Sequence, residues 1–222
     1  MCRRALANAR GAALLLVITL VLLLAAVGAA VSVASRTEIL ISASFRQGRE
    51  AVYAAEGAVA RAARDLALLP DWNVVLSGAV RSPFTDGVAT SPRGLPGGDT
   101  ITLCCGALSL TGEVQQRAFG GRSWGDDTPL WQMFAWGPVS AWSAGSPIDS
   151  RLYVVVWVAD DPDDGDGDPT VDSNGILGLY AHALGPRGAR RVLDALIRRA
   201  PAADEGPPPP RVRILSWREG QW

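Results

Sequence analysis

The segment GAALLLVITLVLLLAAVGAAVSVAS, residues 11–35, decides how the rest of the chain is organised. It has no charged side chain over its 25 residues, and the next charge is Arg36. As an α-helix the segment would be about 37 Å long, which exceeds the hydrocarbon core of a bilayer, about 30 Å thick. Its length and composition therefore predict a helix that crosses a membrane.

Three interpretations of this apolar helix are open. A cleaved secretory signal has a shorter apolar region of roughly 7–15 residues, and here helical spacing continues beyond the apolar run. A plain membrane anchor accounts for the run but not for the Arg10-Gly11 pair at its start. A prepilin-like leader, which is a short basic segment cut after a glycine, accounts for both. We therefore expect a leader at 1–11, cleavage between Gly11 and Ala12, and a membrane helix at 12–35.

The charges at the N-terminal end orient the helix. The leader carries three arginines and no acidic residue, which places it on the cytoplasmic side. All 21 basic residues of the chain are arginines, and the net charge of −1 becomes −4 without the three in the leader. This balance does not favour nucleic acid as a partner. We expect a single membrane span with the remaining chain outside the cytoplasm.

Helical spacing continues through residues 36–69, the expected amphipathic extension of the membrane helix. Apolar and small side chains recur every seven residues in two neighbouring rows: Phe45, Val52, Val59 and Leu66, and Ile41, Gly48, Ala55, Ala62 and Leu69. Such a stripe is typical of a helix that packs on a globular domain. Pro70 ends the helix, because proline disfavours helical conformation in the residue before it. Residues 70–222 are then long enough for one β-rich, extracytoplasmic head.

Three short motifs carry a family resemblance: Arg10-Gly11-Ala12-Ala13-Leu14-Leu15, Arg36-Thr37-Glu38 and Tyr53-Ala54-Ala55-Glu56-Gly57. Together they resemble the N-terminal region of PilX-type minor pilins of type IV pilus assembly, closely over residues 10–66 and loosely over 150–218. The resemblance implies an α+β, pilin-like fold, in which a long N-terminal helix packs on an antiparallel β-sheet head with a loop-rich insertion. It also implies an inner-membrane protein that prepilin peptidase cleaves and that enters a pilus at the cell surface. The residues implied in assembly with other pilins are Leu14, Leu15, Leu16, Glu38, Tyr53 and Glu56.

Leu16 stands where major pilins carry a glutamate that is thought to engage the next subunit. An apolar residue at this position is typical of PilX-like minor pilins and of the large K-type pseudopilin of type II secretion. The resemblance therefore implies a minor component, at or near a filament tip, that primes or modulates assembly. The K-type pseudopilin is the alternative within this class. A membrane-anchored, calcium-dependent adhesin, in which Gly11 is not a cleavage site, is the alternative from another class.

The segment from Asp71 to Pro147 is rich in Gly, Pro, Ser and Thr, and we expect loops and small strands there, the apolar runs 73–76 and 101–103 among them. Its adjacent cysteines, Cys104 and Cys105, can form a vicinal disulfide or remain two buried thiols. Its tryptophans predict the core and rim of the head, with a carbohydrate-binding platform as the alternative: Trp72, Trp124, Trp131, Trp136 and Trp142.

Strand patterns follow in the second half of the chain. Residues 152–159 are β-branched, aromatic and nearly all apolar, as in a central strand, and 176–183 and 131–138 also predict strands. Residues 211–218 alternate and predict an edge strand. The pattern at 189–199 suits a helix and a strand equally, and the PilX-like resemblance implies a strand.

No catalytic motif occurs in the sequence. His182, the only histidine, lies on a predicted strand without a nucleophile motif to support it as a general base. Walker, dinucleotide-binding and zinc-binding spacings are absent. We expect the protein not to be an enzyme.

An acidic loop lies between two predicted strands, with seven aspartates in the thirteen residues 160–172. Such a loop repels itself unless cations neutralise it, and calcium takes six to eight oxygen ligands. The EF-hand template is not met, because Gly175 stands where a glutamate belongs. Two interpretations are open, a solvated acidic loop without a cofactor or a calcium site. The expected ligands are Asp164, Asp166, Asp168 and Asp172, with Asp160, Asp161 and Asp163 as alternates.

Overall fold

A computed structural model describes residues 2–95, 97–117, 128–142, 148–200 and 212–220, with side chains from Gly11 onward. The chain divides into two compact units, Met1–Arg46 and Gln47–Trp222, and each is described by itself. The first unit consists of the initial turns of α1 (Cys2–Ala67). Every residue from 11 to 42 is exposed, and the helix is long and apolar enough to cross a membrane.

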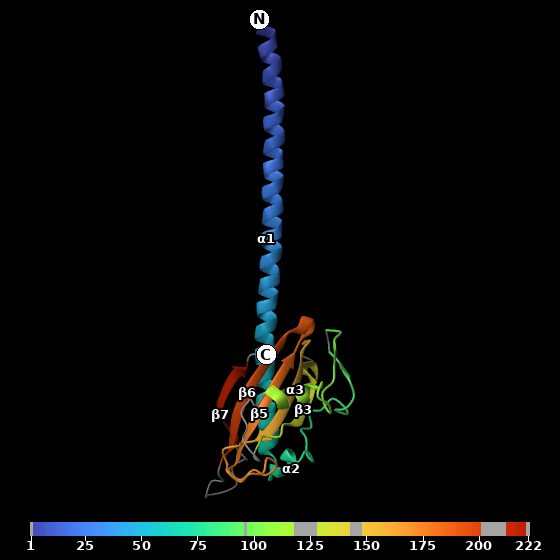
Figure 1. Cartoon of the computed structure of the whole chain (residues 1–222), viewed down its shortest axis with the longest axis vertical. Helices are drawn as coiled ribbons and strands as arrows, with labels where there is room; N and C mark the ends of the chain where they lie inside the picture. The colour runs from blue at the N-terminus through green and yellow to red at the C-terminus, as the bar shows by residue number, and fades with distance from the viewer. Residues whose placement is uncertain (1, 96, 118–127, 143–147, 201–211, 221–222) are drawn as a thin grey trace. The chain divides into compact units, whose positions relative to one another are not determined.

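The second unit contains a five-stranded antiparallel sheet in which each strand pairs with the next along the chain (Figure 1). The strands are β3 (Gln132–Pro138), β4 (Tyr153–Asp160), β5 (Ile176–Leu184), β6 (Arg190–Arg199) and β7 (Val212–Gly220). Every residue of β4 is buried, which confirms the prediction of a central strand. β7 lies at an edge, as predicted, and the strand that the resemblance implied at 189–199 is also confirmed.

The later turns of α1 pack on one face of this sheet. Their buried face is rich in alanine, which lets the helix backbone approach the strands closely, and it contacts valines and leucines of β4 and β5. The two predicted rows meet the sheet only in part, because Ile41 and Phe45 are exposed and packing begins at Ala51. The buried residues of the helix are Ala51, Ala54, Ala55, Ala58, Val59, Ala62, Ala63 and Leu66. The pilin-like α+β architecture is thus confirmed: a long N-terminal helix packed on an antiparallel sheet.

Part of the insertion between α1 and β3 supplies the core on the other face of the sheet, whereas its Val75 and Leu76 join the core on the α1 side. The insertion contains α2 (Asn73–Leu76), β1 (Arg93–Gly94), β2 (Thr100–Ile101) and α3 (Leu110–Arg117). Leu103, Leu110 and Val114 pack there against Trp157 and other residues of β3 and β4. β4 is therefore covered on both faces, which explains its nearly continuous apolar sequence.

Two parts of the insertion differ from the prediction. Residues 73–76 form a helix and not a strand, because the Asp71 side chain accepts a hydrogen bond from the Asn73 amide and starts a helical turn. The helix α3 was not predicted. Its signal is Ser109, whose hydroxyl accepts a hydrogen bond from the Gly112 amide at 3.1 Å, as a helix N-cap does.

The tryptophans of the insertion and β3 follow the predicted division into core and rim. Trp72 and Trp136 are buried, and Trp131 and Trp142 are half-buried at the edges of the two cores. Trp124 lies outside the described residues.

Candidate functional site

The residues expected at the cleavage site and in filament assembly lie on α1. Gly11 and Ala12 are exposed, and a Cβ atom at Gly11 would meet no atom within 4 Å. Leu14, Leu15 and Leu16 are between 62% and 70% exposed. Contiguous apolar surface on this scale marks a membrane or protein contact.

The mid-helix motif lies where α1 meets the head. Tyr53 is exposed, and its hydroxyl accepts a hydrogen bond from the Arg49 guanidinium at 2.9 Å. Glu56 is half-buried, whereas Glu38, nearer the N-terminus, is exposed. Gly57 has a packing role, because a Cβ atom there would lie 2.7 Å from the Trp142 ring. The glycine of this motif therefore serves the fold, while the tyrosine remains accessible to a partner.

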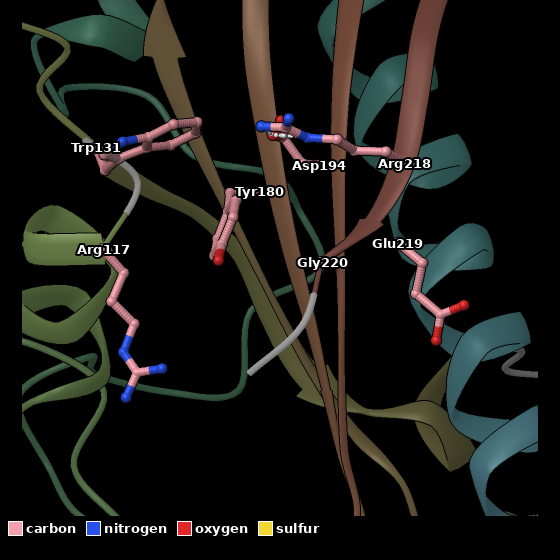
Figure 2. A pocket seen from close by; sticks show the side chains of 7 residues that line it. All are labelled: Arg117, Trp131, Tyr180, Asp194, Arg218, Glu219 and Gly220. Carbon is pink, nitrogen blue, oxygen red and sulfur yellow. Dashed lines mark hydrogen bonds and ion pairs between the residues drawn. The ribbon is translucent and has the colours of Figure 1, made fainter. Parts of the chain in front are cut away.

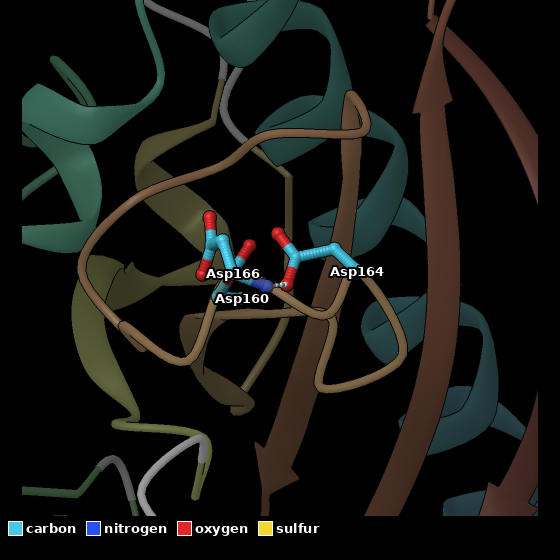
Figure 3. A group of neighbouring side chains, drawn as sticks. All are labelled: Asp160, Asp164 and Asp166. Carbon is cyan, nitrogen blue, oxygen red and sulfur yellow. Dashed lines mark hydrogen bonds between the residues drawn. The ribbon is translucent and has the colours of Figure 1, made fainter.

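The acidic loop joins β4 to β5, and three of its carboxylates converge (Figure 3). Asp160, Asp164 and Asp166 each offer an oxygen, and these oxygens all lie within 4.8 Å of one another. Asp160 is the last residue of β4 and is only 3% exposed. Among the described residues, neither of its carboxylate oxygens has a hydrogen-bond partner. Burial, reinforced by the charge of Asp164, raises the pKa of Asp160 to about 8, although the nearby Asp161 amide acts in the opposite direction.

Hydrogen bonds within the loop hold the other two carboxylates of this cluster. Asp164 accepts hydrogen bonds from the amide and the hydroxyl of Ser173, at 3.2 and 2.9 Å. Burial alone raises the pKa of Asp164, but the bonds from Ser173 and Asp166 outweigh it and lower the pKa. Asp166 accepts a bond from the Asp168 amide at 2.9 Å.

The remaining aspartates of the loop stabilise turns. Asp168 accepts hydrogen bonds from the amide and hydroxyl of Thr170. Asp172 accepts one from the Gly175 amide, and its own amide donates to the Asn73 side chain at 2.8 Å. Asp161 accepts one from the Asp163 amide. The side chain of Asp163 is exposed. The structure therefore brings together two of the four expected ligands, Asp164 and Asp166, and adds the alternate Asp160. Asp168 and Asp172 are not part of this cluster.

A pocket of about 320 Å³ lies on the sheet face opposite α1 (Figure 2). The rings of Trp131 and Tyr180 lie 5.6 Å apart in its wall, and Arg218 forms a 2.8 Å ion pair with Asp194. Burial, together with Asp194, raises the pKa of Tyr180 above its ordinary value. Of the lining residues, the sequence analysis singled out only Trp131. The others are far apart in the sequence and come from α3, β5, β6 and β7: Arg117, Tyr180, Asp194, Arg218, Glu219 and Gly220.

His182 is completely buried in β5 beneath this face. Its ring lies between those of Trp157 and Tyr180, with centroid distances of 5.0 and 5.2 Å. Burial, and then the charges of Arg190 and Arg117, lower the pKa of His182 to about 3. Solvent does not reach the imidazole, which fits the interpretation of His182 as a structural residue.

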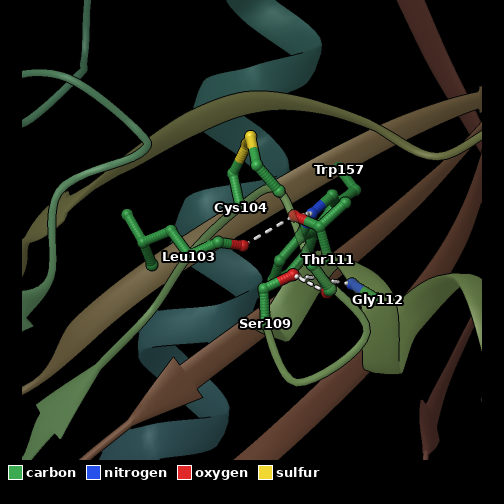
Figure 4. Close-up of a disulfide and its surroundings, with 8 residues drawn as sticks. Leu103, Cys104, Ser109, Thr111, Gly112 and Trp157 are labelled. Carbon is green, nitrogen blue, oxygen red and sulfur yellow. Dashed lines mark hydrogen bonds between the residues drawn. A yellow bond between two sulfur atoms is a disulfide. The ribbon is translucent and has the colours of Figure 1, made fainter.

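Cys104 and Cys105 form a vicinal disulfide, which decides between the two alternatives for this pair (Figure 4). Cys104 is half-buried against the second core, and Cys105 has a positive φ of 75°. Hydrogen bonds fix the adjacent chain: Trp157 donates to the Thr111 hydroxyl, which donates to the Leu103 carbonyl. A disulfide is typical of a compartment outside the reducing cytosol.

Comparisons of the chain with protein-family models, curated proteins and solved structures find no match. The proposed function therefore depends on the geometry of the chain and on the resemblance of its N-terminal motifs to PilX-type minor pilins.

Proposed function

We propose that the protein is a minor pilin of the PilX-like class, which joins a type IV pilus at or near the tip and primes or modulates its assembly. One observation carries this proposal. A single helix, α1, exposes every residue from 11 to 42 and packs its later turns on an antiparallel sheet. The role is structural and not catalytic.

The exposed apolar surface is too large to remain in water. Thirteen large aliphatic side chains between Leu14 and Val33 are 47–70% exposed. At roughly 1.5 kcal/mol for each side chain, leaving them in water costs on the order of 20 kcal/mol, which exceeds the stability of a typical domain. A bilayer covers this surface before assembly. In a filament, the same surface packs against other apolar helices at little cost, because one apolar contact replaces another.

The charges and the disulfide support an orientation with the head outside the cytoplasm. Arg3, Arg4 and Arg10 favour a cytoplasmic N-terminal end, and the Cys104–Cys105 disulfide favours an oxidising compartment for the head. Prepilin peptidase is the first partner and cuts between Gly11 and Ala12. Other pilins are the later partners.

Side chains along α1 supply the contacts with those pilins. Leu14, Leu15 and Leu16 provide apolar contacts, while Glu38 and Tyr53 present polar groups from exposed positions. Glu56 is half-buried, so its carboxylate is less accessible than that of Glu38.

The test is the intact mass of the chain after co-expression with prepilin peptidase. We compare wild type with Gly11→Arg and with Gly28→Ala, a matched control in which the new Cβ meets no atom within 4 Å. The proposal predicts loss of residues 1–11 from wild type and from Gly28→Ala, and retention in Gly11→Arg. Retention in wild type overturns the proposal and leaves a membrane-anchored adhesin. Co-purification of the cleaved chain with sheared pili, and not with a type II secretion pseudopilus, separates the minor pilin from the K-type pseudopilin.

A further inference from the structure

We propose that Asp160, Asp164 and Asp166 bind a calcium ion at the carboxyl end of β4. The site does not depend on the pilus proposal, because all three ligands belong to the folded head. It differs from the site expected from the spacing of the aspartates, since its central ligand is the buried residue at the end of the strand.

Asp160 supplies the observation that points to a ligand. Asp160 is 97% buried, and neither of its carboxylate oxygens forms a hydrogen bond of good geometry among the described residues, although the Asp161 amide is near enough to lower its pKa in part. Buried polar groups in folded proteins are nearly always satisfied, so a carboxylate with two unsatisfied oxygens indicates a missing partner. Protonation removes the charge but leaves a hydroxyl and a carbonyl that still need partners.

The surroundings of Asp160 show which kind of partner fits. The oxygens of Asp164 and Asp166 face those of Asp160 from the loop (Figure 3). Five arginines of the described residues form ion pairs with carboxylates outside the loop, namely Asp65, Asp86, Glu113, Asp194 and Glu219. Three converging carboxylates, when ionised, form an acceptor-only site, for which a metal cation is the complementary group.

The donor set selects calcium among the common cations. The cluster offers only carboxylate oxygens, which favours calcium or magnesium over zinc or copper. Magnesium requires a rigid octahedron and keeps most of its waters, whereas calcium accepts bidentate carboxylates and irregular geometry. The three carboxylates provide up to five oxygens with a free lone pair, because Ser173 occupies Oδ2 of Asp164, and Asp166 lies at the exposed side, where water completes the coordination.

The loop already orients two of these ligands. The amide and hydroxyl of Ser173 hold Asp164, and the Asp168 amide holds Asp166, so little ordering is required when the ion binds. Ser173 occupies both lone pairs of Asp164 Oδ2, so Asp164 would bind the ion through Oδ1, which accepts one bond from the Asp166 amide, and Asp166 Oδ1 likewise keeps one lone pair. The same loop is attached to α2 through the hydrogen bond between Asp172 and Asn73. Calcium would therefore connect the end of β4 to a loop that is fixed to the insertion.

The experiment uses the full chain in detergent, freed of metal with EDTA and titrated with CaCl₂ by calorimetry. Thermal unfolding followed by tryptophan fluorescence gives a second readout. A ligand that binds only the folded state at 100 times its Kd raises the Tm of a domain of this size by about 5–10 °C. MgCl₂ at equal concentration should produce a smaller shift.

Two variants make the test specific. Asp160→Asn should abolish calcium binding and the Tm shift, while its Tm in EDTA stays close to that of wild type, because asparagine has nearly the same size and shape as aspartate. Asp168→Asn is the matched control, since Asp168 lies in the same loop but outside the cluster, and it should keep its calcium affinity within about threefold. The proposal is overturned if calcium leaves the wild-type Tm unchanged, if Asp160→Asn binds as wild type does, or if magnesium gives an equal shift.

Discussion

Replacing Leu66 with alanine measures how firmly α1 packs on the sheet. Leu66 is completely buried in the core between the helix and the strands. Truncating such a leucine costs roughly 2–5 kcal/mol, from the lost apolar burial and from the cavity that remains. In a domain of 150–250 residues each kcal/mol lowers Tm by about 2–4 °C, so a loss of about 3 kcal/mol lowers it by roughly 6–12 °C.

The contacts of Leu66 make this a test of side-chain packing alone. The Trp72 indole donates a hydrogen bond to the backbone carbonyl of Leu66 at 3.0 Å, and the alanine variant keeps that carbonyl. Tryptophan fluorescence is the suitable readout, because all eight tryptophans of the chain lie at position 72 or later. The signal therefore reports on the head and not on the apolar helix, which detergent keeps folded.

The matched control is Leu68→Ala. Leu68 is 70% exposed and lies only two residues further along the chain. Its truncation should change stability by less than about 0.5 kcal/mol, which corresponds to less than about 2 °C. Equal shifts for the two variants, or a Leu66→Ala shift below about 2 °C, would refute the packing of the last turns of α1 against the sheet.

Two further predictions concern other positions in the head. Gly57→Ala should lower stability by about 1 kcal/mol in thermal unfolding, because the clash of its Cβ with Trp142 outweighs the gain in helix propensity. Adding Trp142→Ala should make the glycine replacement favourable, and a loss that persists in the double variant contradicts the clash. The pKa of His182, lowered by burial to about 3, lies below the unfolded value of about 6.5, so the head loses stability as pH falls below 6.5. Between pH 7 and 5 wild type should lose about 2 kcal/mol more than His182→Gln, and parallel pH profiles contradict this.

Sequence patterns predicted the long, regular elements correctly. The apolar run at 11–35 is compatible only with a long helix, and the continuous β-branched run of β4 is compatible only with a buried strand. β6 was ambiguous because its two faces differ: Leu193 and Ile197 are buried against α1, whereas Leu196 is 37% exposed on the other face. The alternation of Leu193, Ala195 and Ile197 correctly indicated a strand. The spacing that suggested a helix depended on Leu196, which is partly exposed on the other face of the sheet.

The insertion was harder to predict, because short capped turns determine its structure. α3 depends on the Ser109 cap, and α2 depends on the Asp71 side chain. The pocket on the sheet was not predictable from local sequence at all. It combines Arg117 from α3 with Tyr180 and Arg218 from different strands, so only the register of the sheet brings them together.

The aspartate cluster shows where sequence reasoning could have gone further. The spacing of the aspartates favoured the middle of the loop, yet burial and not spacing distinguishes Asp160 from its neighbours. Alternation along β4 places Asp160 on the same face as Val154, Val156 and Val158, the face that packs against α1. A strand predicted to be buried on both faces should bury its last residue as well, and here that residue is an aspartate followed by more acidic residues. A buried carboxylate destabilises the head while it lacks a partner, and the same burial strengthens its attraction for a cation once one is bound. The end of a fully buried strand is therefore the place in an acidic loop where a metal ligand should be sought first.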